Sequence, residues 1–445
     1  MQNKYYIETF GCQMNVHESE KIAGMLEALG YSPAATRDDA NVIVFNTCCI
    51  RDTAEQKISG NIGELKALKR EDKSRIVVIA GCMTQQKGAA EALAAKFPFI
   101  DIVLGTANLY ELPAKIAELK ERRARHRGKV VAISYDDNPP IDESVPVART
   151  SYPNAWVNIT YGCNNFCTYC IVPYVRGRER SREPEAIIDE IRSLLAEGYK
   201  EITLLGQNVD SYGSDRSDGV GFAELLRRIA ALPGKFRLRF MTSHPKDLSE
   251  EVVSIIAETP NFCKNIHLPV QAGSDRILKA MNRKYDRAAY LGLIDKIRKY
   301  MPECGLTTDI MVGFPGETEE DFLDTVDLVK RVRYQNAFTF VYSPRRGTVA
   351  ATMPDQIPYA VKRDRITRLI AVQNAITEEL SGEFTGKTYE VLVEDAPKPG
   401  MLCGRTDSGR LVNFAGDRSL VGQFVDIRIT GNKASALYGE IVDNG

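Results

Sequence analysis

Short apolar runs alternate with longer amphipathic runs over the first 120 residues of the chain. The apolar runs predict four strands, and the amphipathic runs between them, with apolar residues every three to four positions, predict four helices. The predicted strands span 5–9, 41–46, 75–80 and 100–104, and the predicted helices span 18–29, 53–69, 84–96 and 108–119. Strands that alternate with helices at this interval form a parallel sheet covered on both faces. We therefore expect an N-terminal α/β domain built on a parallel sheet.

The same alternation resumes at residue 155 and continues to residue 342. Six strands are predicted, and each is followed by a helix-like segment. The predicted strands span 156–159, 201–205, 236–240, 265–268, 305–312 and 337–342. Six such units predict a partial (β/α)6 barrel, and in barrels of this kind the loops at the carboxyl ends of the strands assemble the chemistry.

The tail of the chain changes to short strand-like runs separated by Gly, Pro and Asp turns, which is typical of a small antiparallel β-barrel. The five predicted runs span 390–393, 401–405, 411–414, 425–429 and 434–438. Between the first two patterns lies a stretch that is first basic and then acidic with prolines, which indicates a linker. The sequence therefore predicts an α/β protein in four parts: an N-terminal domain at 1–122, a linker at 123–148, a barrel domain at 149–380 and a small β-barrel at 381–445.

Composition fits a globular protein of the cytoplasm. Charged residues make up 26% of the 445 residues and hydrophobic residues 44%, and both values are ordinary. No apolar stretch reaches the roughly 18 residues that a membrane helix needs, and no signal peptide is recognisable. We therefore expect no membrane partner and cysteines that stay reduced. The net charge of −1 neither requires nor excludes a nucleic-acid partner, because such binding depends on local patches.

Three of the ten cysteines, Cys163, Cys167 and Cys170, form a C-x3-C-x2-C run directly after the first barrel strand. Three thiolates at this spacing can bind three irons of a [4Fe-4S] cluster and leave the fourth iron open to a reacting ligand. A structural zinc site needs one ligand more, and ten cysteines in 445 residues are too few for a disulfide scaffold. The run therefore favours an iron–sulfur cluster with an open iron.

Three further cysteines, Cys12, Cys48 and Cys82, follow the first three strands of the N-terminal pattern. Because the carboxyl ends of parallel strands lie along one edge of a sheet, these cysteines are expected to converge there. Each lies in a polar or glycine-containing turn, which favours a second three-cysteine cluster site over the alternative of ordinary core residues. Cys49 could replace Cys48 as the middle ligand, because only one of two adjacent side chains can face the other two cysteines.

The ends of the later barrel strands are polar or rich in glycine. The residues concerned are Gly206, Gln207 and Asn208 after the second strand, Thr242, Ser243 and His244 after the third, Gln271 and Ser274 after the fourth, and Gly313 and Glu317 after the fifth. Each string alone is ordinary turn chemistry. Together on one rim of a barrel they predict a pocket.

The C-x3-C-x2-C run, with Tyr169 before its last cysteine, resembles the motif of the radical S-adenosylmethionine (SAM) superfamily. The turns around Cys12, Cys48 and Cys82 are similar to those of the methylthiotransferases within that superfamily. The sequences of these turns most resemble those of the tRNA methylthiotransferases that place a 2-methylthio group on N6-isopentenyladenosine. The resemblance covers essentially the whole chain. In the family Cys48 is the ligand of the middle turn and the next residue is commonly serine, where this chain has Cys49.

The resemblance implies two [4Fe-4S] clusters, a radical SAM cluster on the C-x3-C-x2-C run and an auxiliary cluster on the three turn cysteines. It implies that one SAM molecule methylates a sulfur at the auxiliary cluster, while a second is reduced and split to a 5'-deoxyadenosyl radical. The radical takes the hydrogen from C2 of the adenine, and the methylthio group is transferred to that carbon. The implied partners are a tRNA with N6-isopentenyladenosine at position 37, next to the anticodon, and an electron donor such as flavodoxin or ferredoxin. A monomer is expected.

The resemblance also gives candidate contacts for SAM. Tyr169 is expected to pack against the adenine of SAM. The rim residues are expected to border its amino-acid end and its adenosine, and they are Gly206, Gln207, Asn208, Gln271, Ser274, Gly313 and Glu317.

The small C-terminal barrel resembles the TRAM domain, an RNA-binding module. Residues 382–445 contain seven Lys and Arg against nine Asp and Glu, so RNA contact there requires a local face, and a packing domain is the alternative. Arginines at every second position after the cysteine run share one side of an extended segment, where they either hold RNA phosphates or form a solvated run. The RNA-binding candidates are Arg176, Arg178, Arg180, Arg405, Arg410 and Lys433.

Three rival functions use the same cysteines. Two are methylthiolations, one of threonylcarbamoyl-adenosine in tRNA and one of an aspartate in a ribosomal protein. The sequences of the cysteine turns favour the isopentenyl substrate over both. The third is a non-catalytic carrier of iron–sulfur clusters, which would have labile clusters and would not consume SAM.

Overall fold

The computed structural model describes residues 3–49, 52–124 and 129–442, and the chain divides into two compact units. Unit 1 contains Met1–Thr150, Tyr161–Asn165 and Cys170–Arg180, and unit 2 contains Ser151–Thr160, Phe166–Tyr169 and Ser181–Gly445. The division passes through the C-x3-C-x2-C run, because Cys163 and Cys170 belong to unit 1 and Cys167 belongs to unit 2. The four-part boundaries expected from the sequence stay predictions.

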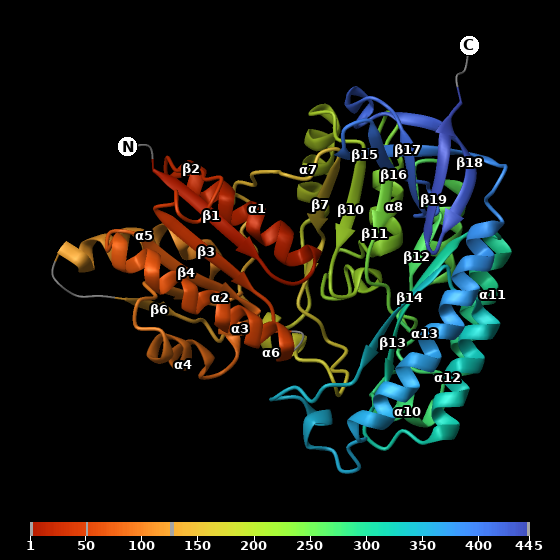
Figure 1. Ribbon diagram of the computed structural model, residues 1–445, viewed down its shortest axis with the longest axis horizontal. Helices are drawn as coiled ribbons and strands as arrows, with labels where there is room; N and C mark the ends of the chain where they lie inside the picture. The colour runs from red at the N-terminus through yellow and green to blue at the C-terminus, as the bar shows by residue number, and fades with distance from the viewer. Residues whose placement is uncertain (1–2, 50–51, 125–128, 443–445) are drawn as a thin grey trace. The chain divides into compact units, whose positions relative to one another are not determined.

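Unit 1 is built on a six-stranded parallel sheet with the order β2-β1-β3-β4-β5-β6 (Figure 1). The strands are β1 (Lys4–Thr9), β2 (Ser32–Pro33), β3 (Val42–Thr47), β4 (Ile76–Gly81), β5 (Ile102–Leu104) and β6 (Val130–Ala132). The helices are α1 (Gln13–Ala28), α2 (Asp52–Glu71), α3 (Cys82–Gln85), α4 (Ala89–Lys96), α5 (Leu112–Ala124) and α6 (Val172–Arg176).

The central strands of this sheet explain the apolar runs in the sequence. Strands β3 and β4 read VIVFNT and IVVIAG, and every residue of both is buried. Parallel strands covered by helices on both faces are apolar along their whole length, as these are. The predicted parallel sheet is confirmed. The short strands β2 and β6 were not predicted, and β6 lies inside the stretch interpreted as a linker. Residues 125–128 of that stretch lie outside the described residues.

Unit 2 contains the six parallel strands of the predicted partial barrel, hydrogen-bonded in two groups with the orders β11-β10-β7 and β12-β13-β14. The strands are β7 (Asn154–Asn158), β10 (Glu201–Leu205), β11 (Arg237–Phe240), β12 (Asn265–His267), β13 (Gly305–Val312) and β14 (Asn336–Val341). The helices are α7 (Pro184–Ala196), α8 (Phe222–Ala230), α9 (Glu250–Glu258), α10 (Asp275–Ala280), α11 (Arg287–Tyr300), α12 (Glu319–Val332) and α13 (Tyr359–Gly382). Two-residue strands β8 (Thr160–Tyr161) and β9 (Arg180–Ser181) pair with each other.

Helices α12 and α13 lie side by side in unit 2 (Figure 1). Helix α12 begins with a capping box, in which the Thr318 side chain accepts from the backbone of Asp321 and the Asp321 side chain accepts from the backbone of Thr318. This cap fixes the start of α12 directly after the loop 313–317, which the sequence placed on the rim of the barrel.

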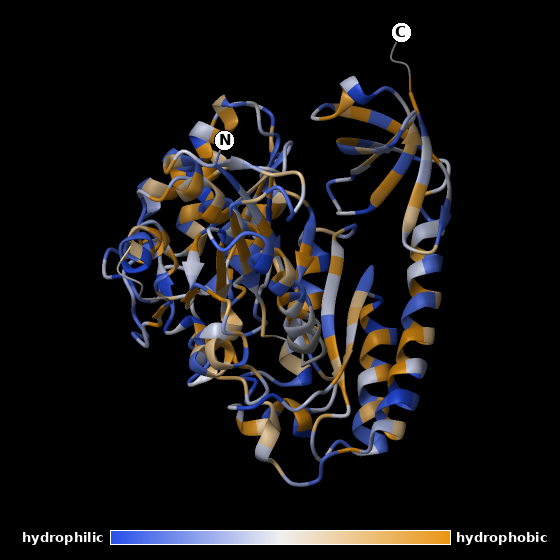
Figure 2. Cartoon of the chain, turned by 60° about the vertical axis from the view of Figure 1, so that its left-hand side comes forward, coloured by the Kyte–Doolittle hydropathy of each residue, from blue (hydrophilic) through white to orange (hydrophobic). Residues whose placement is uncertain are grey.

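The C-terminal segment closes into a five-stranded barrel with the order β15-β16-β17-β19-β18. Its strands are β15 (Thr388–Lys398), β16 (Met401–Arg405), β17 (Leu411–Ala415), β18 (Phe424–Lys433) and β19 (Ala436–Ile441). Hydrophobic and hydrophilic residues alternate along these strands (Figure 2), as expected when one face of each strand lines a small core. The barrel is confirmed, with one difference: β17 and β19 pair in parallel, while the other four pairings are antiparallel.

None of the helices in the described ranges is long and apolar enough to cross a membrane.

Candidate functional site

The cysteine turns of unit 1 lie at one edge of its sheet. Strands β1 and β3 are paired in register up to Thr9 opposite Asn46, and β3 and β4 up to Thr47 opposite Gly81. Cys12 caps the start of α1 after β1, Cys48 directly follows β3, and Cys82 is the first residue of α3 after β4. The three strand ends are therefore neighbours, as the sequence predicted.

The glycines before two of these cysteines allow the turns to approach each other closely. A Cβ on Gly11 would lie 2.9 Å from the Cys48 sulfur, and a Cβ on Gly81 would lie 2.5 Å from the carbonyl oxygen of Thr47. Both glycines also have positive φ angles, of 113° and 102°. Only glycine meets both conditions, so the sequence Gly-Cys in these turns is what brings the turns together.

Both cysteines of the middle turn are buried, and they face different neighbours. Cys48 lies against Gly11, next to Cys12, whereas Cys49 belongs to the same core cluster as Cys82. A hydrogen bond with Cys49 and the nearby Arg176 guanidinium lower the pKa of the buried Cys82 thiol to about 7. Cys82 therefore gives up its proton easily, as a thiolate ligand must. The assignment of Cys48 as the middle ligand stays a prediction.

Arg176, the last residue of α6, lies beside this set of thiols. Its guanidinium donates to both carboxylate oxygens of Glu18, at 2.6 and 3.1 Å, and to Asn15 Oδ1 at 2.9 Å. The Asn15 amide in turn donates to the carbonyl oxygens of Phe10 and Thr47, one in each of two cysteine turns. Burial opposes the charge on Arg176, yet its pKa is raised well above the ordinary value, because Cys82 and Glu18 favour the cation. A buried cation is therefore held next to the cysteines.

The thiols of this edge fit a [4Fe-4S] cluster better than a single metal ion. Among the described residues, no group of three Cys, His, Asp or Glu side chains is arranged to hold one metal ion. A [4Fe-4S] cube instead takes each cysteine on a different iron, so its ligands need not meet at one point. Three separate turns with an acidic thiol and a buried counter-cation suit this donor set.

The C-x3-C-x2-C run is held by contacts in both units. In unit 1 the Cys163 amide donates to the carbonyl of Gly177 at 3.2 Å. In unit 2 Arg283 donates to the Cys167 sulfur at 3.5 Å and to the carbonyl of Pro269 at 2.9 Å. Tyr169 packs against an apolar cluster of unit 2 that includes Ala272 and Phe314, each next to a residue of the predicted rim. Arg283 was not singled out from the sequence.

The ends of β7 and β10 carry buried polar groups that the protein does not satisfy. Asn158 Oδ1 and Nδ2, Thr160 Oγ1 and Asn208 Oδ1 have no hydrogen-bond partner within the described residues. Thr160 lies directly against the turn after β10, since a Cβ on Gly206 would be 2.2 Å from its hydroxyl oxygen. Asn208 is held by its amide, which donates to Asp247 at 2.7 Å. Buried polar groups of this kind are normally paired, so this edge fits a polar ligand.

Of the three residues that carry these groups, one was predicted and two were missed. Asn208 belongs to the rim inferred from the sequence, whereas Asn158 and Thr160 were not identified. A polar residue at the end of the apolar run Trp156 to Ile159 was the available signal for Asn158.

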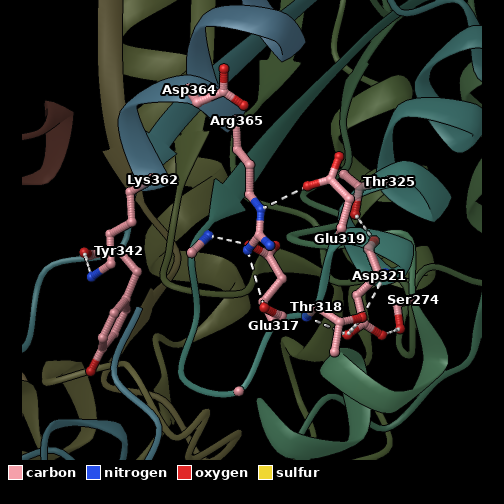
Figure 3. A network of polar contacts seen from close by, with 12 residues as sticks. Ser274, Glu317, Thr318, Glu319, Asp321, Thr325, Tyr342, Lys362, Asp364 and Arg365 are labelled. Carbon is pink, nitrogen blue, oxygen red and sulfur yellow. Dashed lines mark hydrogen bonds and ion pairs between the residues drawn. The ribbon is translucent and has the colours of Figure 1, made fainter. Parts of the chain in front are cut away.

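The loop after β13 forms a buried ionic network (Figure 3). Glu317 accepts from the Gly313 amide at 2.6 Å and from Arg365 of α13 at 2.8 Å. Burial raises the pKa of Glu317, although both partners lower it. Lys362, also on α13, donates to the carbonyl of Tyr342 at 2.9 Å. The Glu317 carboxylate therefore shapes its own loop, and Arg365 and Lys362 are supports that the sequence did not reveal.

Two further rim residues are also held by neighbouring strands and helices. Ser274 donates its hydroxyl to the Asp321 carboxylate at 2.5 Å, and so joins the cap of α12. Gln271 has a φ of 68° and exchanges backbone hydrogen bonds with Asp309 and Met311 of β13. Their roles toward SAM stay predictions.

Two of the six RNA-binding candidates are buried, which corrects their assignment. Arg176 is turned into unit 1 and paired with Glu18, so it does not present its charge to an RNA. Arg410 is only 3% exposed, donates to the Ser381 hydroxyl, and lies over the Phe384 ring. Burial lowers the pKa of Arg410 to about 10. Both arginines are buried because they contact partners far away in the sequence. The local spacing of the arginines does not show such partners.

The other four candidates have diverse surroundings. Arg178 is exposed and lies 3.6 Å from Asp137, and Arg180 donates to the carbonyls of Arg176 and Pro139. Arg176 ends α6, and Gly177 turns the chain before Arg178. Arg176, Arg178 and Arg180 therefore do not form one face of an extended segment. In the C-terminal barrel Arg405 pairs with Glu394, and Lys433 is exposed at the end of β18.

Three family models match the chain. Residues 4–105 match the uncharacterized protein family UPF0004, residues 157–329 match the radical SAM superfamily, and residues 382–442 match the TRAM domain.

Similar proteins of known structure support the fold. A radical SAM methyltransferase, TsrM from Kitasatospora setae, solved with cobalamin and a [4Fe-4S] cluster, superposes with a TM-score of 0.57 at 16% identity. The match covers 79% of this chain and 77% of that one. The cobalamin-dependent radical SAM enzyme OxsB matches with a TM-score of 0.53 at 12% identity, over 83% of this chain and 56% of that one.

Curated relatives match over nearly the full length. A tRNA-2-methylthio-N(6)-dimethylallyladenosine synthase of Thermoanaerobacter pseudethanolicus is 51% identical, over 99% of this chain and 93% of the relative. The enzyme of the same name from Clostridium botulinum strain Langeland is 52% identical, over 98% of this chain and 96% of the relative. At this identity and coverage, the chain belongs to the family of tRNA-2-methylthio-N(6)-dimethylallyladenosine synthases, which are radical SAM enzymes.

Proposed function

We propose that the chain methylthiolates C2 of N6-isopentenyladenosine at position 37 of tRNA, using SAM both as methyl donor and as the source of the 5'-deoxyadenosyl radical. The strongest structural support is the convergence of three cysteine turns at one sheet edge of unit 1, next to the buried cation of Arg176. A parallel sheet needs no such set of thiols for its stability. A second cluster site in addition to the radical SAM run is what separates sulfur insertion from simpler radical SAM chemistry.

In this proposal Cys163, Cys167 and Cys170 hold one [4Fe-4S] cluster, and Cys12, Cys48 and Cys82 hold the other. Held by these cysteines, the first cluster would supply the electron that splits SAM, and the second would hold the sulfur to be transferred. The residues around them have roles that can be read from their contacts. Arg283 donates to the Cys167 sulfur, and Arg176 places a positive charge beside Cys82, so each thiolate set has a fixed counter-cation.

The SAM site is proposed at the carboxyl ends of the barrel strands in unit 2. Asn158, Thr160 and Asn208 offer buried polar atoms that lack partners within the described residues, which suits the amino-acid part of SAM. Tyr169, Gly206, Gln207, Gln271, Ser274, Gly313 and Glu317 are proposed as further SAM contacts. The Glu317–Arg365 pair holds the loop 313–317 in place. A dry site of this kind protects a reactive radical from side reactions.

The proposed macromolecular partner is a tRNA that carries N6-isopentenyladenosine next to its anticodon. The TRAM domain is the proposed RNA contact, with Lys433 and Arg405 as candidates for phosphates. A small electron donor, such as flavodoxin or ferredoxin, a monomeric state and a cytoplasmic location complete the proposal.

Mass spectrometry of tRNA nucleosides tests the substrate. In cells that lack this gene, 2-methylthio-N6-isopentenyladenosine should disappear and N6-isopentenyladenosine should accumulate. The wild-type gene and a Cys403→Ala control should restore the product, since Cys403 lies in the C-terminal barrel, whereas Cys82→Ala should not. An unchanged product in the deletion strain would refute the substrate assignment.

A second measurement separates the enzyme from an iron–sulfur carrier. The purified protein, reconstituted with iron and sulfide and then reduced, should convert SAM to methionine and 5'-deoxyadenosine. A carrier would release its cluster to an acceptor protein without consuming SAM.

A further inference from the structure

Unit 1 contains a small cavity whose walls are mainly apolar. Its volume is about 100 Å3. It lies between α1, the turn after β5 and the segment 139–145. The apolar side chains that line it are Met25, Ala107, Leu109, Pro140, Ile141 and Val145.

The polar side chains around the cavity are engaged with the protein. Lys21 donates to the hydroxyl of Tyr161 at 2.9 Å, and Arg176 and Glu18 are paired with each other. Thr106 donates to the carbonyl of Val175. A group that enters the cavity therefore meets carbon atoms, which favours an apolar ligand.

The cavity borders the cysteine turns. Arg176 and Glu18 line it, and the guanidinium of Arg176 also contacts Asn15, whose amide donates to the carbonyl of Thr47 at 3.0 Å. Thr47 directly precedes Cys48. One buried ion pair therefore separates an apolar cavity from the edge where the three cysteine turns meet.

Positive charge borders the same cavity. Lys21 and Arg180 both line it and lie over the Tyr161 ring, at 5.6 and 6.0 Å from its centre. The cavity is lined by three cations and two carboxylates, which are Lys21, Arg176, Arg180, Glu18 and Asp142. This excess of positive charge suits an apolar group that is attached to a polyanion.

We propose that this cavity binds the branched five-carbon chain of the substrate nucleoside, and so selects adenosines that carry it. The inference rests on the proposed function, because it takes the prenylated tRNA as the substrate. The volume supports it: a buried cavity of ~150 Å3 accommodates benzene, with six carbons, so about 100 Å3 suits five carbons and excludes a purine ring. The purine must then lie outside the cavity, with the chain on its N6 directed inward.

The test measures binding, without turnover, to two synthetic anticodon stem-loops that differ only in the isopentenyl group. The full-length protein, reconstituted with iron and sulfide and kept without reductant, is titrated by fluorescence anisotropy. The wild type should bind the prenylated stem-loop roughly ten- to a hundredfold more tightly, because burying five carbons is favourable. Ala107→Leu, which fills the cavity, should bring this ratio close to one and leave the affinity for the unprenylated stem-loop unchanged.

A matched control makes the same exchange on the surface. Ala117 is exposed on α5 of the same unit, so Ala117→Leu should keep the wild-type ratio. Val145→Phe fills the cavity from the segment 139–145 instead. It should also bring the ratio of the two affinities close to one, so it serves as the test if Ala107→Leu does not fold. A wild-type ratio near one would overturn the inference. So would folded Ala107→Leu or Val145→Phe protein that retains the preference.

The inference and the proposed function can fail separately. If the reduced wild-type enzyme forms methylthio product while the cavity-filling variants retain the prenyl preference in binding, only the cavity assignment fails. If the preference is present and is lost on filling the cavity, but no methylthio product forms with SAM and reductant, the cavity assignment stands and the proposed reaction fails.

Discussion

Replacing Arg176 by methionine should destabilise unit 1 far more than an ordinary surface substitution. The Arg176 and Glu18 side chains are only 6% and 8% exposed, and they are joined by two hydrogen bonds. Arg176→Met leaves the Glu18 carboxylate buried without its cation. It also removes the donor that Asn15 Oδ1 accepts from.

The magnitude follows from the burial of the pair. Removing one partner of a buried ion pair costs about 3–5 kcal/mol, because the remaining charge is left uncompensated. Replacing both partners by apolar residues of similar size is close to neutral in many proteins. We therefore expect about 1 kcal/mol for Arg176→Met combined with Glu18→Leu, chiefly from the lost hydrogen bond to Asn15.

Hydrogen exchange of the α1 amides is the suitable assay. A single free energy of unfolding is poorly defined for a chain with two compact units, whereas exchange reports the opening of one segment. The reduced apoprotein should be used at about pH 6, which is below the Cys82 pKa of about 7. The Cys82 thiol is then mostly protonated, so its negative charge contributes little to the interactions of Arg176. Amides of α1 should then exchange roughly a hundredfold to a few thousandfold faster in Arg176→Met than in the wild type.

Arg178→Met is the matched control, because Arg178 is two residues away and 57% exposed, with a carboxylate at 3.6 Å. It should change exchange by less than about tenfold, as expected for an exposed ion pair. The reasoning is refuted if Arg176→Met exchanges no faster than Arg178→Met. It is also refuted if the double variant is as destabilised as Arg176→Met alone, since the unpaired Glu18 charge would then not be the cause.

Three further predictions concern the clusters, the barrel and the TRAM domain. Alanine at all three cysteines of the C-x3-C-x2-C run should leave about four irons per chain after anaerobic reconstitution, and retention of none would contradict an independent second cluster. Burial raises the pKa of Asp210 to about 7 from the ordinary 3.8, so the folded state favours its protonated form. The stability this gives is complete below pH 3.8 and is lost as the pH rises through 7, and thermal unfolding of Asp210→Asn should lack that loss. Lys433→Ala should lower the slope of log affinity for tRNA against log salt by about one, whereas Arg410→Lys, at a buried position, should lower the melting temperature and leave the slope unchanged.

The elements that the sequence predicted correctly are those with a strong local pattern. Strands β10 and β13 have the predicted bounds, because each ends directly before a glycine turn that is visible in the sequence, at Gly206 and at Gly313. The convergence of the cysteine turns was also predictable, since parallel strands place their carboxyl ends at one edge whatever the helices between them do. Strand β2 was missed because it has only two residues, and β6 was missed because it lies in the stretch whose composition indicated a linker.

What local pattern could not show is which charged groups are buried. Arg176 and Arg178 look equivalent in the sequence, yet Glu18, 158 residues away, draws only Arg176 into unit 1. The burial of Arg410 likewise depends on its contacts with Ser381 and Phe384, which lie earlier in the chain. For Asn158 the sequence offered only a polar residue in an apolar run, and the lack of partners for its buried amide among the described residues requires coordinates to see.

The segment after the C-x3-C-x2-C run connects Cys170 to the cysteine turns of unit 1. Cys170 begins the segment Cys170–Arg180, which belongs to unit 1, and its apolar residues Ile171 and Val175 lie in the same core cluster as Cys49 and Cys82. Packed cores resist small displacements, because a change of even one methylene is felt by the neighbours. The position of Cys170 relative to the cysteine turns of unit 1 is therefore set by the core of unit 1 together with the Arg176–Glu18 pair. The short sequence between the C-x3-C-x2-C run and Arg176 thus packs against the edge where the three cysteine turns meet as well as following the run.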